Sequence, residues 1–334
     1  MPDAPYQRIA VIGAGAWGTA LALVARRAGR DVVIAAREAE VVEAINTTRR
    51  NGLFLPGVVL DDGIRATADA AAAAAQADVV LLAAPAQHLR AVSATLAPHI
   101  AEKRPVIICA KGIERGTGML MSEVASETLP RAALAILSGP TFAAEVARGL
   151  PTAVTLATRE STGGRLLASI GSTTFRPYLS NDPIGAQVGG AVKNVIAIAC
   201  GIVTGRGMGD NARAALMTRG LAEIMRLGTA LGARPETLMG LSGLGDLSLT
   251  CNGLQSRNMS VGIALGQGQT LAQTLSGKRS IAEGVESAAA IAELARRRGV
   301  DMPIVAAVDA ILHHGAAIDD TIAGLLARPF KPEH

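Results

Sequence analysis

Residues 8–29 read "RIAVIGAGAWGTALALVARRAG", and this stretch decides the fold of the first half of the chain. A short Val/Ile run is followed by three glycines, Gly13, Gly15 and Gly18, and then by an Ala/Leu-rich segment with helical spacing. In such a strand–turn–helix unit the glycines allow a tight turn, the close approach of a pyrophosphate and close packing of helix on strand. The helix N-terminus attracts the phosphates. The stretch therefore predicts a dinucleotide-binding unit of the Rossmann type.

The rest of the first half alternates short apolar runs with helical patterns. The candidate strands are residues 8–12, 31–36, 78–83, 105–110 and 133–137, with helical patterns such as 18–28, 70–77 and 88–100 between them. Near-continuous apolar strands separated by helices are typical of a parallel sheet that is buried on both faces. Two further strands, 152–158 and 173–179, are expected to extend this sheet.

After residue 182 the pattern changes to long Ala/Leu/Met segments with helical spacing. These predicted helices cover residues 185–203, 211–231, 256–265, 284–298 and 302–313. We therefore expect an α/β fold in two domains. A doubly wound, mainly parallel Rossmann-type sheet over residues 1–185 binds the dinucleotide, and an all-helical domain over residues 186–334 carries substrate and catalytic residues.

The composition excludes several classes of protein. The formal charge of +4 is spread thinly over 334 residues and only 2% of them are aromatic, so no nucleic-acid footprint is present. Three widely spaced cysteines argue against a disulfide framework or a metal site, and for a reducing compartment. The N-terminus lacks a signal core, and the apolar stretch 188–203 is short for a membrane span. We expect a cytoplasmic protein without an integral membrane segment.

One lysine in that apolar stretch requires an explanation. The chain contains 5 Lys and 27 Arg, so Arg is its usual cation, yet residues 189–203 read "GGAVKNVIAIACGIV" around Lys193. A buried ammonium is normally paired, shifted in pKa or turned towards a water-lined cleft. Lys, unlike Arg, can also lose its proton. The alternative is that the Lys193 stem merely extends to the surface.

Two predicted strands end in motifs that face the expected ligand crevice. Lys111-Gly112 follows the strand 105–110, and Gly139-Pro140-Thr141 follows the strand 133–137. The carboxyl ends of parallel strands form the ligand-binding edge of such a sheet, which places Lys111 and the second turn at the ligand. The alternatives are an ordinary strand end and an ordinary turn.

Residues 241–260, "LSGLGDLSLTCNGLQSRNMS", are polar where the second domain is otherwise apolar. This predicted loop-to-helix region gathers Asp246, Thr250, Asn252, Ser256, Arg257 and Asn258. Ser256 is typical of a helix N-cap, so the helix start would present free N–H groups together with the Arg257 guanidinium. These groups predict a phosphate site, with a plain surface cap as the alternative.

The residues at the end of the second predicted strand indicate whether NAD or NADP is bound. A strict NAD site usually has Asp or Glu there, but this chain has Ala35-Ala36 followed by Arg37. Arginine at this point accepts the 2′-phosphate of NADP, so we expect NADP to be used, with NAD also accepted. The alternative is a solvated Arg37 partly neutralised by Glu38.

Together these motifs resemble those of bacterial-type NAD(P)-dependent glycerol-3-phosphate dehydrogenases, from about residue 9 to past residue 303. The shared strings, in family order and spacing, are the GxGxxG with an aromatic at Trp17, "AKGIE", "SGPTFAAE", "GGAVKNV", "ARAALMTRGLAE", "GLGDLSLTC", "SRN" and "AEG". The resemblance implies reversible hydride transfer between NAD(P)H and dihydroxyacetone phosphate. The product is sn-glycerol 3-phosphate for phospholipid synthesis. A homodimer is expected.

The resemblance also implies residue roles. Lys193 would be the proton donor and acceptor, with a pKa lowered by partial burial and by nearby cations such as Lys111, while Asp246 opposes that shift. Asn194 would hydrogen-bond the substrate or orient a neighbour. The implied substrate contacts are Lys111, Gly139, Thr141, Lys193, Asp246, Ser256, Arg257 and Asn258. The implied cofactor contacts are Gly13, Gly15, Ala16, Trp17, Gly18, Arg37, Lys111, Ala143, Arg257, Ile281 and Glu283.

One position departs from the family pattern, because many members have Ser where this chain has Ala16, which leaves only the backbone N–H for the pyrophosphate. Two other hypotheses remain beside the dehydrogenase. The first is a hydroxyacid or sugar-phosphate dehydrogenase that shares the two-domain plan and a Lys-Asn helix. The second is a non-catalytic nicotinamide-binding sensor.

Overall fold

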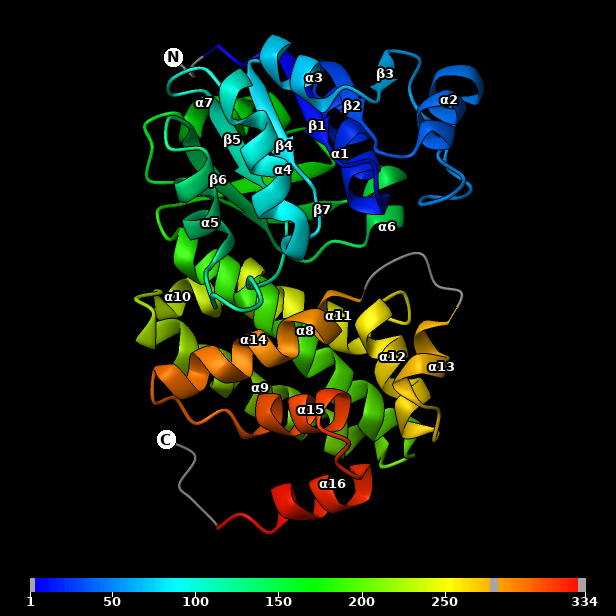
Figure 1. Cartoon of the computed structure of the whole chain (residues 1–334), viewed down its shortest axis with the longest axis vertical. Helices are drawn as coiled ribbons and strands as arrows, with labels where there is room; N and C mark the ends of the chain where they lie inside the picture. Colours follow the sequence, from blue (N-terminus) through cyan, green and yellow to red (C-terminus); the bar gives the residue numbers. More distant parts are fainter. Residues whose placement is uncertain (1–3, 277–281, 330–334) are drawn as a thin grey trace.

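The computed structural model describes residues 4–276 and 282–329. Figure 1 shows an α/β part, which contains the N-terminus, stacked on an all-helical part that contains the C-terminus. The strands are β1 Arg8–Ile12, β2 Asp31–Ala35, β3 Ile64–Thr67, β4 Val79–Leu82, β5 Pro105–Ile108, β6 Ala133–Ser138, β7 Thr152–Ala157 and β8 Phe175–Ser180. The α/β architecture expected from the sequence is confirmed.

The helices fall into two groups. The α/β part contains α1 Ala16–Arg27, α2 Ala39–Thr48, α3 Ala70–Gln76, η1 Ala86–His88, α4 Leu89–Leu96, η2 Ala97–His99, α5 Met121–Thr128, α6 Ala143–Ala147 and α7 Gly163–Ile170. The helical part contains α8 Pro183–Gly205, α9 Gly209–Ala230, α10 Pro235–Leu238, the π-helical turn η3 Leu241–Gly245, α11 Asp246–Asn252, α12 Arg257–Gly266, α13 Leu271–Leu275, α14 Glu283–Arg297, α15 Pro303–His313 and α16 Ile318–Leu326.

The eight strands form one sheet in the order β3-β2-β1-β4-β5-β6-β7-β8. All neighbouring pairs are parallel except β6 and β7, so the mainly parallel doubly wound sheet is confirmed, including its extension by β7 and β8. The sequence did not predict β3. This edge strand buries only Ile64 completely and therefore lacks the apolar run by which central strands are recognised.

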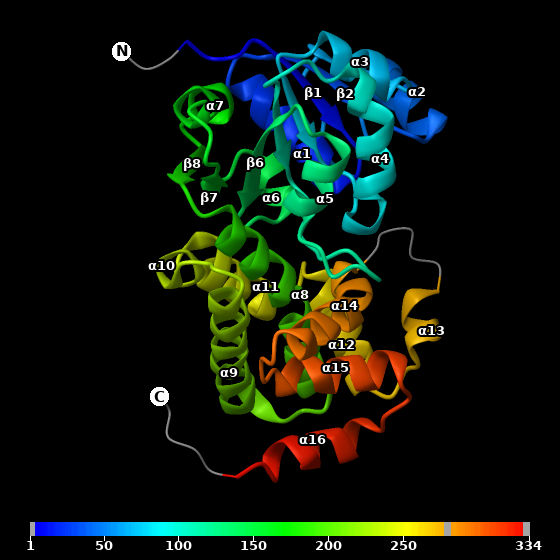
Figure 2. The same cartoon turned by 60° about the vertical axis from the view of Figure 1, so that its left-hand side comes forward.

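Helices cover both faces of the sheet. Buried side chains of α1, α2, α6 and α7 form the core on one face, and those of α3, α4 and α5 form the core on the other. Both layers are visible around the strands in Figure 2. Because both faces are covered, ligands reach the sheet at its edges, and the carboxyl-terminal edge of β1, β4, β5 and β6 faces the helical part.

Helix α8 is the centre of the helical part. Every residue from Gly185 to Val203 is buried. The helix is long and apolar enough to span a membrane by composition, but 89% of its most apolar window is buried inside the protein. It is therefore a core helix of the fold.

Small residues allow α8 to contact α12 backbone to backbone. A Cβ added at Gly201 would lie 2.3 Å from the Met259 carbonyl oxygen, and one added at Gly262 would lie 2.1 Å from the Ile198 carbonyl oxygen. Non-bonded atoms cannot approach so closely, so both positions require glycine. This contact fixes the start of α12 relative to the middle of α8, where Lys193 lies.

Two segments cross between the parts. Ala186, in the first turn of α8, packs in a core of the sheet, whereas Val188 and later residues pack in the helical core. Ile113 and Leu120, which follow β5, also pack in the helical core. We propose residues 1–185 and 186–334 as the two domains, with the boundary inside α8.

Candidate active site

The turn between β1 and α1 has the shape of a phosphate cradle. Gly13 has φ +109°, and a Cβ there would lie 2.9 Å from the Ala83 carbonyl oxygen. A Cβ on Gly18 would overlap the Gly13 carbonyl oxygen at 1.8 Å. A Cβ on Gly15 would meet nothing within 4 Å. Gly13 and Gly18 thus serve close packing within the chain, and Gly15 leaves open space where a diphosphate would approach.

The first turn of α1 has unused hydrogen-bond donors. Gly15 is the N-cap and offers no side-chain cap, and the first turn contains no acidic residue. The first N–H groups of a helix lack partners within the helix, so those of Ala16 and Trp17 are available. The Trp17 Nε1 atom is also buried without a hydrogen-bond partner among the described residues. The turn therefore fits the diphosphate of a nicotinamide dinucleotide, even without a serine hydroxyl at Ala16.

Arg37 lies just beyond the end of β2, as the sequence predicted. Its side chain is 87% exposed, and its Nη2 atom contacts Glu38 Oε1 at 2.9 Å. Ala35 and Ala36 before it are buried. The guanidinium is thus free to turn towards a 2′-phosphate at the cost of one weak surface ion pair.

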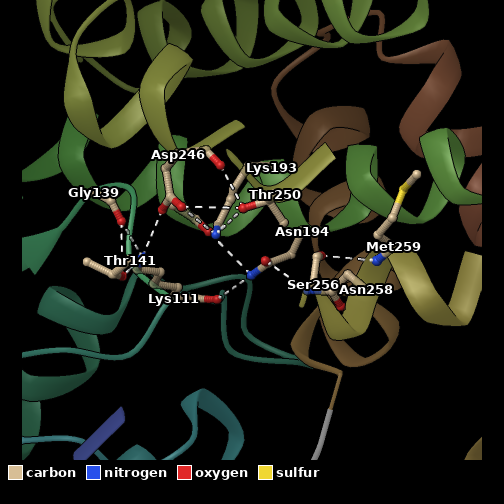
Figure 3. Close-up of polar contacts among 11 residues, drawn as sticks. Lys111, Gly139, Thr141, Lys193, Asn194, Asp246, Thr250, Ser256, Asn258 and Met259 are labelled. Carbon is tan, nitrogen blue, oxygen red and sulfur yellow. Dashed lines mark hydrogen bonds and ion pairs between the residues drawn. The ribbon is translucent and has the colours of Figure 1, made fainter. Parts of the chain in front are cut away.

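A buried ion triad lies between the sheet and the helical part (Figure 3). Asp246 is fully buried, and its Oδ1 atom is 2.6 Å from Lys193 Nζ while its Oδ2 atom is 2.8 Å from Lys111 Nζ. The Lys193 and Lys111 side chains are 8% and 13% exposed. Two ammonium groups share one carboxylate, so the triad carries a net positive charge. Such a site stabilises a substrate oxygen on which negative charge develops.

Each member of the triad comes from a different element. Lys193 is in the middle of α8, Lys111 follows β5, and Asp246 begins α11. Gly190 leaves room for Ser138, because a Cβ there would lie 2.7 Å from Ser138 Oγ, and the Lys111 stem passes the same position at an ordinary contact distance of 3.5 Å. The interpretation of Lys193 as a merely surface-reaching lysine is wrong, since its ammonium is held inside by two hydrogen bonds.

The predicted loop before Ser256 is largely helical. The π-turn η3 leads directly into α11, and Gly243 within it packs so tightly that a Cβ would overlap the Leu238 carbonyl oxygen at 1.8 Å. As a result Thr250 lies one helical turn after Asp246, where its Oγ1 atom donates to the Asp246 carbonyl oxygen and accepts from Lys193 Nζ at 2.7 Å. Asn252 bonds the Ser248 carbonyl oxygen on the exposed side of α11, away from the triad.

Burial and neighbours shift the pKa of Lys193. Desolvation lowers this pKa to about 8, the Lys111 charge also lowers it, and the Asp246 carboxylate opposes the shift. These are the directions expected from the sequence. An amine with a pKa near 8 is present in both protonation forms around neutral pH, as a residue that must give and take a proton requires.

A chain of amide hydrogen bonds connects the triad to the start of α12. Asn194 Nδ2 donates to the Lys111 carbonyl oxygen at 3.2 Å, and Asn258 Nδ2 donates to Asn194 Oδ1 at 2.9 Å. Asn258 Oδ1 accepts from the Gly284 N–H. Asn194 therefore orients its neighbours, one of the two roles that the sequence left open for it.

The start of α12 has the form that the sequence predicted. Ser256 is the N-cap, and its hydroxyl accepts from the Met259 N–H at 3.2 Å. The Arg257 side chain is exposed and has no hydrogen bond to any other described residue. An exposed guanidinium beside a capped helix start is suited to a phosphate group.

The other candidate positions gather at the same edge of the sheet. Gly139, with φ +140°, offers its carbonyl oxygen to Lys111 Nζ at 2.8 Å, and Thr141 Oγ1 lies 3.2 Å from the same atom. Ala143 begins α6. Partly buried Glu283 accepts weakly from the Ala86 N–H at 3.5 Å, and desolvation raises its pKa.

One predicted cofactor contact remains outside this description. Ile281 lies outside the residues that the structure describes. For metals, residues 4–276 and 282–329 hold no cluster of three or more His, Cys, Asp or Glu side chains that could bind an ion.

Comparison with known proteins places the chain in a family. Sequence profiles described as the N-terminus and the C-terminus of NAD-dependent glycerol-3-phosphate dehydrogenase match residues 8–163 and 182–323. The chain belongs to the NAD-dependent glycerol-3-phosphate dehydrogenase family. This family membership confirms the expected enzyme class, an NAD(P)-dependent oxidoreductase. It replaces the hypothesis of a non-catalytic nicotinamide-binding sensor.

The relatives match over nearly their whole length. The glycerol-3-phosphate dehydrogenases [NAD(P)+] of Parvibaculum lavamentivorans and Caulobacter vibrioides are each 60% identical over 329 residues, covering 98% of this chain and 98% and 99% of theirs. The crystal structure of the Coxiella burnetii glycerol-3-phosphate dehydrogenase superposes with a TM-score of 0.93 at 37% identity, covering 96% of this chain and 99% of that one. A D-mandelate dehydrogenase structure, 15% identical with a TM-score of 0.62, shares the fold alone.

Proposed function

We propose that this chain interconverts dihydroxyacetone phosphate and sn-glycerol 3-phosphate with NAD(P)H, and that Lys193 is its proton donor and acceptor. The observation that carries the assignment of Lys193 is its ammonium, held by Asp246 and Thr250 with a pKa of about 8. It lies where the carboxyl edge of the sheet meets the helical part. The names of the relatives at 60% identity support the substrate and the cofactor.

The reaction adds a hydride to C2 of the ketone and a proton to its oxygen. Bound NADPH or NADH supplies the hydride. In this proposal Lys193 gives its proton to the C2 oxygen during reduction, so the C=O bond becomes CH–OH and Lys193 is left neutral. In the oxidation of sn-glycerol 3-phosphate, neutral Lys193 accepts the hydroxyl proton. Asp246 and Thr250 hold the amine in place in both directions.

The remaining polar groups would bind and orient the substrate. Lys111 is bonded to the Gly139 carbonyl oxygen, to Thr141 and to Asp246, so its charge is fixed beside the reacting oxygen. We assign the substrate contacts to Lys111, Gly139, Thr141, Lys193, Asp246, Ser256, Arg257 and Asn258. We assign the cofactor contacts to Gly13, Gly15, Ala16, Trp17, Gly18, Arg37, Lys111, Ala143, Arg257, Ile281 and Glu283.

Arg37 is proposed to favour NADPH. Replacing Arg37 with Ala should raise KM for NADPH about tenfold and change KM for NADH much less, since one charge-assisted hydrogen bond is worth about 1.5–3 kcal/mol. Initial rates with each cofactor at saturating dihydroxyacetone phosphate measure both constants. Because Glu38 competes for Arg37 at 2.9 Å, Glu38→Gln is the matched control and should lower KM for NADPH slightly. Equal changes for both cofactors in Arg37→Ala would show that Arg37 is only a surface residue.

Arg257 is proposed to bind the substrate phosphate. A guanidinium forms two parallel hydrogen bonds to phosphate, a geometry that an ammonium cannot reproduce. Arg257→Lys should therefore reduce kcat/KM for dihydroxyacetone phosphate about tenfold or more. Unphosphorylated dihydroxyacetone serves as the matched substrate, and its kcat/KM should change much less. A proportional loss on both substrates would contradict the assignment.

We further propose a cytoplasmic homodimer that supplies glycerol 3-phosphate for phospholipid synthesis. Cys109, Cys200 and Cys251 are free and buried, which is consistent with a reducing compartment. Tyr178 and Leu179 are half-exposed on the edge strand β8, an apolar surface that a second copy would cover. Light scattering coupled to size-exclusion chromatography tests the dimer, and a mass of about one chain would contradict it.

A further inference from the structure

The two parts of the molecule are joined on either side of the ion triad, and the first junction is strong. Residues 112–120 reach from the α/β part towards α14 in Figures 1 and 2. Ile113 is fully buried and Leu120 is 4% exposed in the helical core, and the two pair as an antiparallel bridge. Arg115 adds an ion pair to Glu286 at 3.0 Å. Separating the parts here would expose two apolar side chains, which is costly.

The second junction is slight and exposed. It is formed by residues 253–256, between α11 and α12, and by α6 and its N-cap Phe142 of the sheet part. Gln255 Nε2 donates to Glu145 Oε1 at 2.7 Å, in an exposed hydrogen bond. A Cβ at Gly253 would lie 2.4 Å from the Phe142 ring, so the ring rests on the glycine backbone. Contacts of this kind can open and close during turnover.

This slight junction immediately precedes the start of α12. Gln255 is followed by Ser256, Arg257 and Asn258, the residues assigned to the substrate phosphate. On the other side, Glu145 is two residues after Ala143, which is assigned to the cofactor. The Gln255–Glu145 hydrogen bond thus ties the segment that carries the phosphate site to the domain that carries the dinucleotide.

We propose that Glu145 and Gln255 are positioning residues, which together hold the phosphate-binding start of α12 in register with the dinucleotide domain. The inference rests on the proposed function, because the residues positioned are those assigned to the substrate phosphate. Lys193 and Asp246 are buried in this arrangement, so substrate must enter by a local opening. The exposed Gln255–Glu145 side opens for entry, and the buried 112–120 side remains closed and acts as the hinge.

A charge swap tests the pair. Gln255→Glu places a second carboxylate against Glu145, and like charges repel. It should raise KM for dihydroxyacetone phosphate about tenfold while kcat stays within about twofold, since the reacting groups are untouched. The double variant Glu145→Gln/Gln255→Glu rebuilds the same amide–carboxylate hydrogen bond in the reverse direction. Its KM should return to within about twofold of the wild type.

Controls separate this effect from charge alone. Gln267→Glu adds the same charge at the exposed far end of α12 and should leave KM unchanged. Wild-type KM in Gln255→Glu would overturn the proposal. So would a double variant that stays impaired, because the new carboxylate would then be repelling the phosphate directly. If Arg257 does not bind the substrate phosphate, the result is different: Arg257→Lys then lowers kcat/KM equally for dihydroxyacetone phosphate and for unphosphorylated dihydroxyacetone.

Discussion

Lys193→Met is expected to lower kcat about 10²- to 10⁴-fold in both directions, because the variant retains the length and apolar stem of the side chain but has no proton to transfer. Its thermal unfolding should remain close to that of the wild type. Asp246, which loses one partner, stays paired with Lys111 at 2.8 Å and is not left as an isolated buried charge. Absorbance at 340 nm with dihydroxyacetone phosphate or sn-glycerol 3-phosphate gives kcat directly.

Two variants serve as controls for Lys193→Met. Lys193→Arg should not restore turnover, since a guanidinium remains protonated at every pH at which the enzyme is folded. Lys103→Met removes the same charge from the exposed Lys103 and should retain wild-type kcat. Turnover near the wild-type value in Lys193→Met would end the assignment of Lys193 as the proton donor.

Asp246→Asn is expected to have the second largest effect. The carboxylate raises the pKa of Lys193 against burial and the charge of Lys111. Without it the pKa falls below about 8, so a larger share of the amine is deprotonated at pH 7.5 and cannot act as the acid. We expect kcat/KM for dihydroxyacetone phosphate to fall about 10²-fold at this pH and to recover partly as pH is lowered.

The stability of Asp246→Asn must be measured together with its loss of kcat/KM. Asp246→Asn leaves two buried ammonium groups without their carboxylate, and an uncompensated buried charge typically costs about 3–5 kcal/mol, so the melting temperature should fall. Asp319→Asn removes the exposed partner of Arg206 and should change neither stability nor rate appreciably. A folded Asp246→Asn enzyme with wild-type kcat/KM at pH 7.5 would show that Asp246 does not set the protonation of Lys193.

The sequence predicts the parts of the fold whose patterns are local. The strand–glycine–helix unit at residues 8–29 and the long apolar helix α8 follow directly from spacing and hydropathy. The edge strand β3 does not, because Ile64 is its only fully buried residue. The π-turn before α11 is also missed, because a glycine usually indicates a loop, whereas Gly243 is required there by packing against Leu238.

In the candidate active site, too, the sequence predicts features that depend on neighbouring residues and misses contacts between residues far apart in the chain. An isolated lysine in an apolar helix predicts that Lys193 is special, but only the fold shows that Asp246 lies between it and Lys111. The contribution of Thr250 could have been found from its spacing, four residues after Asp246 on one helix face. The Gln255–Glu145 contact could not, since it joins residues 110 apart through surface side chains.

The pH dependence of the wild-type enzyme tests the central claim most directly. Reduction requires protonated Lys193, so kcat/KM for dihydroxyacetone phosphate should be constant at lower pH and fall as pH rises through about 8. Oxidation requires the neutral amine, so kcat/KM for sn-glycerol 3-phosphate should rise through the same pH. Measured at constant ionic strength, this mirrored pair of profiles is the predicted result. Profiles that lack a titration near pH 8, or that change in the same direction for both substrates, would contradict the account.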